Sequence, residues 1–307
     1  MNPARPRTLH QATAESVMRC LLSQRADGSW RGGPAPLDVL ETALTVRAFR
    51  EDPAFREHAL PAALTYLGAT QHDDGGWAET AGSPRTEPGV TGLVLSSLAG
   101  LPVPHRLLEG GFAFLQEHQG ADGLWCERAR APRGPGAEAV AHVLAALRAH
   151  PSAHLIPVEG ALTWLGARVH QAGDGADAGP RLPGLPCAVL RTADALGAHS
   201  PHSWEAARAL AGARRPDGGW SHTGDGPGTP GATGLALAAL ARTGLLHQGS
   251  WETAVALLLG HRADGGPGVR EPGPLPYHSP VVTDAFVMTG LNALRHVAPT
   301  PETVAVA

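Results

Sequence analysis

The stretch Gln71-His72-Asp73-Asp74-Gly75-Gly76-Trp77 decides the fold, because its Asp-Gly-x-Trp core returns along the chain at nearly constant spacing. Further full copies are Asp27–Trp30, Asp122–Trp125 and Asp217–Trp220, while Asp174-Gly175 and Asp264-Gly265 keep the turn without the tryptophan. Successive aspartates are 47, 48, 52, 43 and 47 residues apart. A fixed period of this size indicates one supersecondary unit that is repeated.

Each unit contains two helical patterns that the Asp-Gly turn separates. In the second unit, residues 59–67 have apolar residues at helical spacing, whereas residues 90–98 are apolar nearly all round, which is typical of a helix buried on both sides. We therefore predict an all-α fold, a single α/α barrel of six inner and six outer helices over residues 1–307. The six repeats of about 50 residues are expected near 12–52, 53–103, 104–151, 152–201, 202–248 and 249–298.

The second helices of the six units align on their last apolar residue. These anchors are Phe49, Leu98, Leu147, Leu196, Leu240 and Leu291. Six positions earlier, five of the six units have a small residue, and the set is Ala43, Gly92, Ala141, Leu190, Gly234 and Ala285. Small side chains at this position let neighbouring inner helices approach closely around the ring.

Bulk composition excludes several classes of protein. The formal charge is −4 with 24 Lys and Arg, which gives no electrostatic footprint for nucleic acid. No apolar run reaches the roughly 20 residues of a membrane span, and no apolar segment of a signal peptide follows the N-terminus. The three cysteines form no CxxC pair. We expect a soluble cytoplasmic protein without a bound cofactor.

The turns point to a known family. Together with Gln24, Gln71 and Gln119, the Asp-Gly-x-Trp motif resembles the QW repeat of squalene and oxidosqualene cyclases. The same barrel occurs in class II diterpene cyclases and in the β subunits of protein prenyltransferases. The resemblance covers all six units and implies the α/α barrel. It indicates the activity less strongly, because one fold hosts different chemistries. The turns themselves are expected to be structural.

Class II cyclases begin an inner helix with Asp-x-Asp-Asp-Thr-Ala, whose middle aspartate protonates the substrate. Residues 38–43 here keep the outer acids and Thr-Ala but have Leu40 in the middle. In the third unit Glu138 occupies the equivalent position, and His142 lies one turn later on the same face. Glu138 is surrounded by small apolar residues, and a buried carboxyl of this kind can serve as a general acid. We predict a relocated acid site, with a buried structural pair as the alternative.

Further residues complete the predicted site. Asp38, Glu41 and Asp284 are expected at the same mouth of the barrel as Glu138, although Asp38 and Glu41 also suit a helix N-terminus. Candidate substrate contacts are Phe286, Tyr277, His278, Phe49 and Arg191. The leading function is therefore acid-initiated cyclisation of a small isoprenoid or another apolar substrate by a class II terpene cyclase-like enzyme.

Two alternatives remain open. Tyr277-His278-Ser279 resembles the segment with the zinc-binding histidine of protein prenyltransferases, but Cys187 lacks the Asp-x-Cys context, so no metal is predicted. A non-catalytic barrel that binds a lipid or a protein is the other alternative.

Two features oppose a cyclase. Aromatic residues, which stabilise carbocations, are only 5% of the chain, and the resemblance implies a second barrel that is missing here. For a cyclase, these two features leave three alternatives: the substrate is small, the chemistry is less cationic, or a partner protein completes the site.

Overall fold

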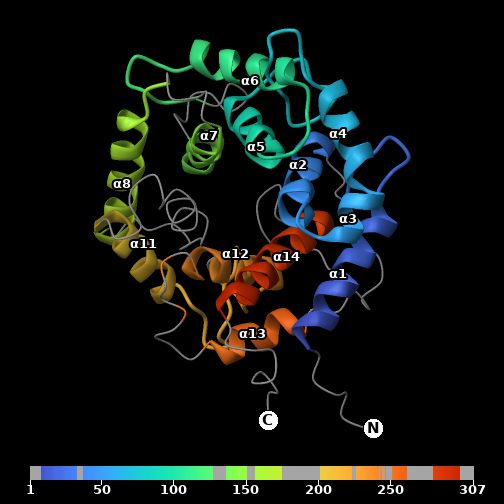
Figure 1. The fold of residues 1–307 in the computed structure, drawn as a ribbon. Helices are drawn as coiled ribbons and strands as arrows, with labels where there is room; N and C mark the ends of the chain where they lie inside the picture. The colour runs from blue at the N-terminus through green and yellow to red at the C-terminus, as the bar shows by residue number, and fades with distance from the viewer. Residues whose placement is uncertain are drawn as a thin grey trace.

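The computed structural model describes residues 8–32, 37–126, 136–150, 156–174, 201–222, 226–241, 243, 246, 251–260 and 279–297. Its helices form two concentric layers (Figure 1). The outer layer contains α1 (Leu9–Ser23), α3 (Pro53–His58), α4 (Leu60–Ala69), α6 (His105–Glu117), α8 (Glu159–Asp174), α11 (Pro201–Gly212) and α13 (Glu252–Leu259). The inner layer contains α2 (Asp38–Phe49), α5 (Pro88–Leu98), α7 (Ala137–Ala149), α12 (Pro230–Ala241) and α14 (Pro280–Val297).

The all-α prediction is confirmed. The described residues contain helices, turns and a single isolated β-bridge between Trp220 and Thr229. None of the described helices combines the length and the apolarity needed to cross a membrane.

The inner helices contact one another in the order α7, α5, α2, α14 and α12, so the last unit packs on the first. This contact brings the two ends of the repeated region together, as a ring requires (Figure 1). The fourth inner helix is expected within residues 152–201, most of whose second half lies outside the described residues. The closed ring of six repeats and its single domain therefore stay predictions.

Two glycines bring pairs of inner helices into close contact. A Cβ added at Gly92 of α5 would lie 2.6 Å from the Cα and N of Val143 on α7. A Cβ at Gly234 of α12 would lie 3.0 Å from Cα of Val287 on α14 and still closer to the carbonyl of Phe286. Real Cβ atoms do not approach so closely, so these positions require glycine. The predicted role of small residues in the ring is confirmed at both places.

The described Asp-Gly turns share one local structure. Asp74 Oδ1 accepts a hydrogen bond from the N–H of Gly76 at 2.9 Å, and Gly75 has φ +84°, a conformation that favours glycine. The same Asx-turn bond and positive φ occur in the turns at Asp27, Asp122 and Asp217. The repeated dipeptide is thus explained by the shape of the turn.

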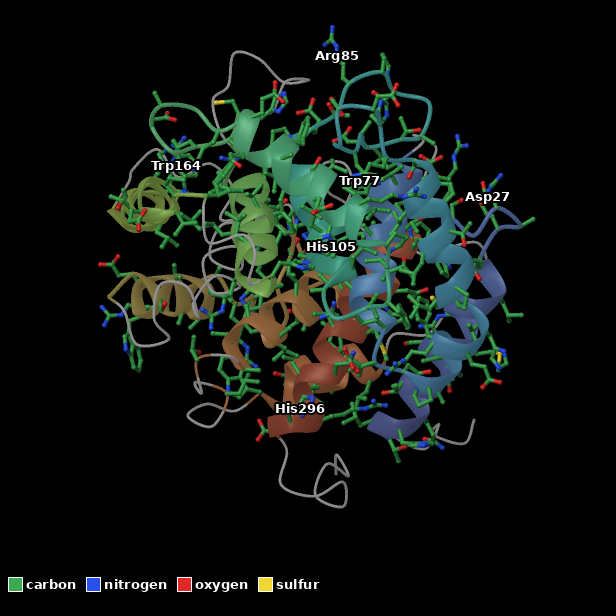
Figure 2. The ribbon with its side chains drawn as sticks, turned by 45° about the horizontal axis from the view of Figure 1, so that its top comes forward. Asp27, Trp77, Arg85, His105, Trp164 and His296 are labelled. Carbon is green, nitrogen blue, oxygen red and sulfur yellow. The ribbon has the colours of Figure 1, made fainter. Side chains whose placement is uncertain are left out.

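In the second unit, the tryptophan and the glutamine of the turn connect three helices. Trp77 is fully buried beside α6 (Figure 2), and its Nε1 donates to the carbonyl of Leu67 at the end of α4 at 2.7 Å. Its backbone N–H donates to Thr91 Oγ1 on α5 at 2.9 Å. Gln71 Nε2 donates to the carbonyl of Leu107 on α6 at 2.9 Å. The turn therefore joins its own outer helix to its inner helix and to the next outer helix, a structural role as predicted.

Candidate functional site: the polar corner of the inner ring

The inward face of each inner helix follows from its other contacts. Outer helices contact one side, as shown by Phe49 of α2 stacked on Phe55 of α3 and by Asp284 of α14 paired with Arg19 of α1. Because successive residues turn by about 100°, the residues opposite this side lie nine, five and two positions before each anchor. On the described helices these are Leu40, Leu44 and Arg47; Gly89, Leu93 and Ser96; Glu138, His142 and Ala145; Gly231, Leu235 and Ala238; and Val282, Phe286 and Thr289.

Ionisable side chains on this inward face are few. Among the described residues just named they are Arg47, Glu138 and His142, and all the others are apolar, glycine or hydroxyl residues. Each of the three is half-buried. Arg47 lies on α2, whereas Glu138 and His142 lie one turn apart on α7. We call these three residues the polar corner.

One side-chain contact joins the two helices of the polar corner. Arg47 Nη1 lies 3.3 Å from Nδ1 of His142. Both α2 and α7 pack on α5, whose outer side is covered by α6, so the contact passes along the inner side of α5. α5 is buried along its whole length, which is consistent with this arrangement.

The contact also fixes the protonation pattern of the histidine. An arginine guanidinium has N–H donors and no acceptor, so Nδ1 of His142 accepts the hydrogen bond from Arg47. In the neutral ring the proton is then on Nε2. The accepting nitrogen of His142 thus faces Arg47, and Glu138 lies one helical turn earlier on α7.

Glu138 and His142 are thus brought to the same inward face, as their spacing predicts. Leu40, which replaces the aspartate of the cyclase motif, is half-buried at the equivalent position of α2. The structure places an acid on α7 at the position where the motif would have it on α2. Its catalytic role remains a prediction.

The other acids of the predicted site face different neighbours. Asp38 Oδ1 accepts from the N–H of Val39 and from the N–H of Ala81 in the next loop, both at 3.2 Å. The same carboxylate lies near the hydroxyl of Tyr66, where burial first and then Asp38 raise the tyrosine pKa. Asp38 therefore ties the start of α2 to the outer layer, and its side chain is not brought into the polar corner.

Glu41 is fully buried at the contact between α2 and α14. Its Oε2 accepts a hydrogen bond from the N–H of Gly32 at 2.6 Å, and a Cβ on Gly32 would lie 2.8 Å from Ser279 Oγ. Glu41 thus holds the loop after Trp30 against the beginning of α14. It lies about 100° around α2 from the inward face, which separates it from the polar corner.

Asp284 points to the outer layer. Its Oδ1 lies 3.0 Å from Arg19 Nη2 on α1, an ion pair in which both side chains are 21% exposed. The nearby Asp284 carboxylate also contributes to raising the pKa of the Cys20 thiol, although burial is the larger cause. The expected gathering of Asp38, Glu41 and Asp284 with Glu138 around one mouth is therefore not what the side-chain contacts show.

The predicted substrate contacts divide in a similar way. Phe286 is on the inward face of α14, 6.2 Å between ring centroids from His222. Phe49 faces outward and stacks on Phe55 at 5.7 Å, so it belongs to the packing between the layers. Tyr277, His278 and Arg191 lie outside the described residues, as does Cys187. In the part of the chain that is described, no group of three His, Cys, Asp or Glu residues could hold a metal ion.

Sequence reasoning missed two residues. Arg47 could have been found as a single charge in the otherwise apolar second half of α2, two residues before the anchor. His222 follows Trp220 by two residues and is almost completely buried. The sequence signal for His222 was weaker. Two residues after the tryptophan, the first two units have Gly32 and Glu79, which share no chemical property with histidine.

The sequence matches no protein-family model and no curated protein, whereas solved structures are similar over nearly the whole chain. The type II terpene cyclase MstE from Scytonema aligns with a TM-score of 0.70 at 16% identity, covering 94% of this chain and 99% of that chain. A variant of MstE in complex with its substrate, geranylgeranyl dihydroxybenzoate, gives a TM-score of 0.69 at 17% identity, covering 94% and 97%.

Two other structures show how widely the fold is used. The ent-copalyl diphosphate synthase from Streptomyces platensis has a TM-score of 0.60 at 23% identity over 83% of this chain and 50% of its own. Alpha-2-macroglobulin from E. coli has 0.57 at 17% identity over 94% of this chain and 17% of its own.

These comparisons correct one expectation. A second barrel is not required of a type II terpene cyclase, because the aligned region covers 99% of the MstE chain. Structural matches at identities below 25% establish the fold alone, so the activity has to be inferred from the residues of the site. This chain therefore has a class II terpene cyclase-like fold.

Proposed function

We propose that the protein is a class II terpene cyclase-like enzyme that protonates and cyclises an apolar isoprenoid inside the ring of inner helices. The observation that carries the proposal is the polar corner. On the described inward face, Arg47, Glu138 and His142 are the ionisable groups, and they stand among apolar and small residues. An apolar site with a few placed polar groups is the usual form of a small-molecule site.

Each residue of the polar corner has a separate role in the proposal. Glu138 is the proton donor. His142 donates its Nε2–H to the second oxygen of the Glu138 carboxyl and so directs the acidic O–H towards the substrate. Arg47 is a positioning residue, because its hydrogen bond to Nδ1 of His142 holds the imidazole in this tautomer. Phe286, on the inward face of α14, offers an aromatic face to a developing cation.

The reaction balances as an isomerisation. The Glu138 proton adds to one carbon of a terminal double bond, and the neighbouring carbon becomes cationic. The π electrons of the next double bond then form a new carbon–carbon bond to that carbon. The final cation loses a proton, so the product has the mass of the substrate, and Glu138 regains a proton from the solvent.

The likeness to MstE supports an isoprenoid with a long chain, because that enzyme's substrate is geranylgeranyl dihydroxybenzoate. The alignment covers 99% of the MstE chain, so the proposal requires no partner protein. The second candidate is a barrel that binds a lipid or a protein without catalysis, in which the contact of Arg47 with His142 has only a structural role. The two candidates differ in whether solvent protons enter the ligand.

An assay in D₂O separates them. The purified protein is incubated with geranylgeranyl dihydroxybenzoate, geranylgeranyl diphosphate and geranylgeraniol, and the products are analysed by mass spectrometry. The proposal predicts an isomer that carries one deuterium on carbon, with or without EDTA. Stoichiometric binding without conversion would replace the proposal with the non-catalytic barrel. Activity that EDTA abolishes would favour the zinc-dependent prenyl transfer alternative.

A further inference from the structure

A groove of about 620 Å³ lies on the outer surface between α4 and α6, outside the ring of inner helices. Its wall is formed by α4 on one side and by the first turn of α6, marked by His105 in Figure 2, on the other. The connection from α5 to α6 closes the bottom of the groove. The volume is in the range of small-molecule sites in proteins.

The floor of the groove is apolar and its shape is rigid. Leu60, Leu98 and Leu107 are almost completely buried residues of this floor. Pro102 and Pro104 fix the backbone of the connection and contribute no N–H groups to it. Most of the groove lining therefore suits an apolar chain.

The charges at the groove have one sign. Among its lining residues the charged ones are Arg56, from α3, and Arg106, from α6. Both side chains are exposed, and neither has an ion pair within the described part of the chain. Glu109, three residues after Arg106, lies 3.1 Å from Nδ1 of His105 instead. Two arginines above an apolar floor complement an anion attached to a hydrocarbon chain.

We propose that this groove binds a soluble single-chain amphiphile with an anionic phosphate or carboxylate head group. The hydrocarbon chain lies on Leu64, Leu101 and Val103, the half-buried apolar residues of the lining. The head group meets Arg56 and Arg106. The site is separate from the polar corner and does not depend on the proposed cyclase activity. It would hold such an amphiphile at the surface of the protein.

The test uses dodecyl phosphate below its critical micelle concentration, with isothermal titration calorimetry. We expect one molecule to bind per chain, and dodecanol to bind at least about tenfold more weakly, because it lacks the charge. Arg56→Glu and Arg106→Glu should each weaken binding by about three- to tenfold or more. Thr65→Trp, at an exposed lining position, should also weaken binding by filling the groove.

Two controls keep the result specific. Arg208→Glu changes an exposed arginine on α11 and should leave binding unchanged. Glu138→Gln should also leave binding unchanged, which separates this groove from the ring interior. Binding that is insensitive to Arg56, Arg106 and Thr65, or binding confined to anionic phospholipid vesicles, would overturn the proposal.

Discussion

Replacing Trp77 with phenylalanine tests how the repeated turn stabilises the fold. The indole is fully buried, and its Nε1 donates to the carbonyl of Leu67 at 2.7 Å. Trp77→Phe keeps an aromatic ring but removes this donor. The Leu67 carbonyl still accepts from the Thr70 hydroxyl at 3.2 Å, so the lost hydrogen bond costs about 0.5–1.5 kcal/mol. The space left by the smaller ring adds about 1 kcal/mol.

The expected loss is therefore about 1.5–2.5 kcal/mol of unfolding free energy, or about 2–4 °C in Tm for a chain of this size. Urea and thermal unfolding followed by circular dichroism would measure it. The matched control is Trp204→Phe on α11, because Trp204 is 48% exposed and should change stability by less than about 0.5 kcal/mol. Equal effects of the two substitutions would refute the structural role of the turn.

Two further predictions concern packing and reactivity. Gly92→Val should destabilise the protein by about 1–3 kcal/mol or more, because its Cβ would lie 2.6 Å from Val143 backbone atoms. Gly82→Ala, with no atom within 4 Å of the added Cβ, is the control, and comparable melting curves would contradict the close approach. Burial raises the pKa of the Cys20 thiol, so at pH 8 iodoacetamide should label exposed Cys126 and spare Cys20 until urea unfolds the chain. Peptide mass spectrometry would detect early labelling of Cys20.

The fold was predictable because its signals are local and repeated. An Asp-Gly turn requires a positive φ at glycine, and the four complete copies satisfy this requirement in the same way. One substitution hid part of the pattern. In the fourth full copy Arg214 replaces the glutamine, and its Nε donates to the carbonyl of Gly218 at 2.8 Å. The arginine retains the donors that the turn needs, which a search for glutamine overlooks.

The direction of Asp284 was harder to predict, although helix geometry contains the answer. Asp284 lies seven residues before the anchor, and three other units have a threonine at this position: Thr42, Thr91 and Thr233. Each threonine hydroxyl accepts a hydrogen bond from the backbone N–H of the tryptophan in its turn. This position therefore faces outward. In the last unit Pro267 stands in place of the tryptophan and has no N–H. Asp284 instead pairs with Arg19.

The polar corner was only half predictable. The spacing of Glu138 and His142 places them on one face of a helix from sequence alone. Arg47 comes from a helix about a hundred residues earlier, and its contact with His142 depends on the way that α2 and α7 both pack on α5. Sequence periodicity gives the face of each helix, whereas the partner across the ring depends on the tertiary arrangement.

The most direct test of the central claim compares Glu138→Gln with Asp284→Asn in the D₂O assay. Both changes remove an acid from an inner helix, but Glu138 faces inward and Asp284 pairs with Arg19 in the outer layer. We predict that Glu138→Gln lowers the rate of deuterium incorporation into the cyclised product by about 10²–10⁴-fold, the usual contribution of a general acid. Asp284→Asn should keep the rate within about threefold, because the Asp284 side chain pairs with Arg19 of the outer layer and lies away from the polar corner. An unchanged rate in Glu138→Gln, or a larger loss in Asp284→Asn, would contradict the assignment of the acid to the polar corner.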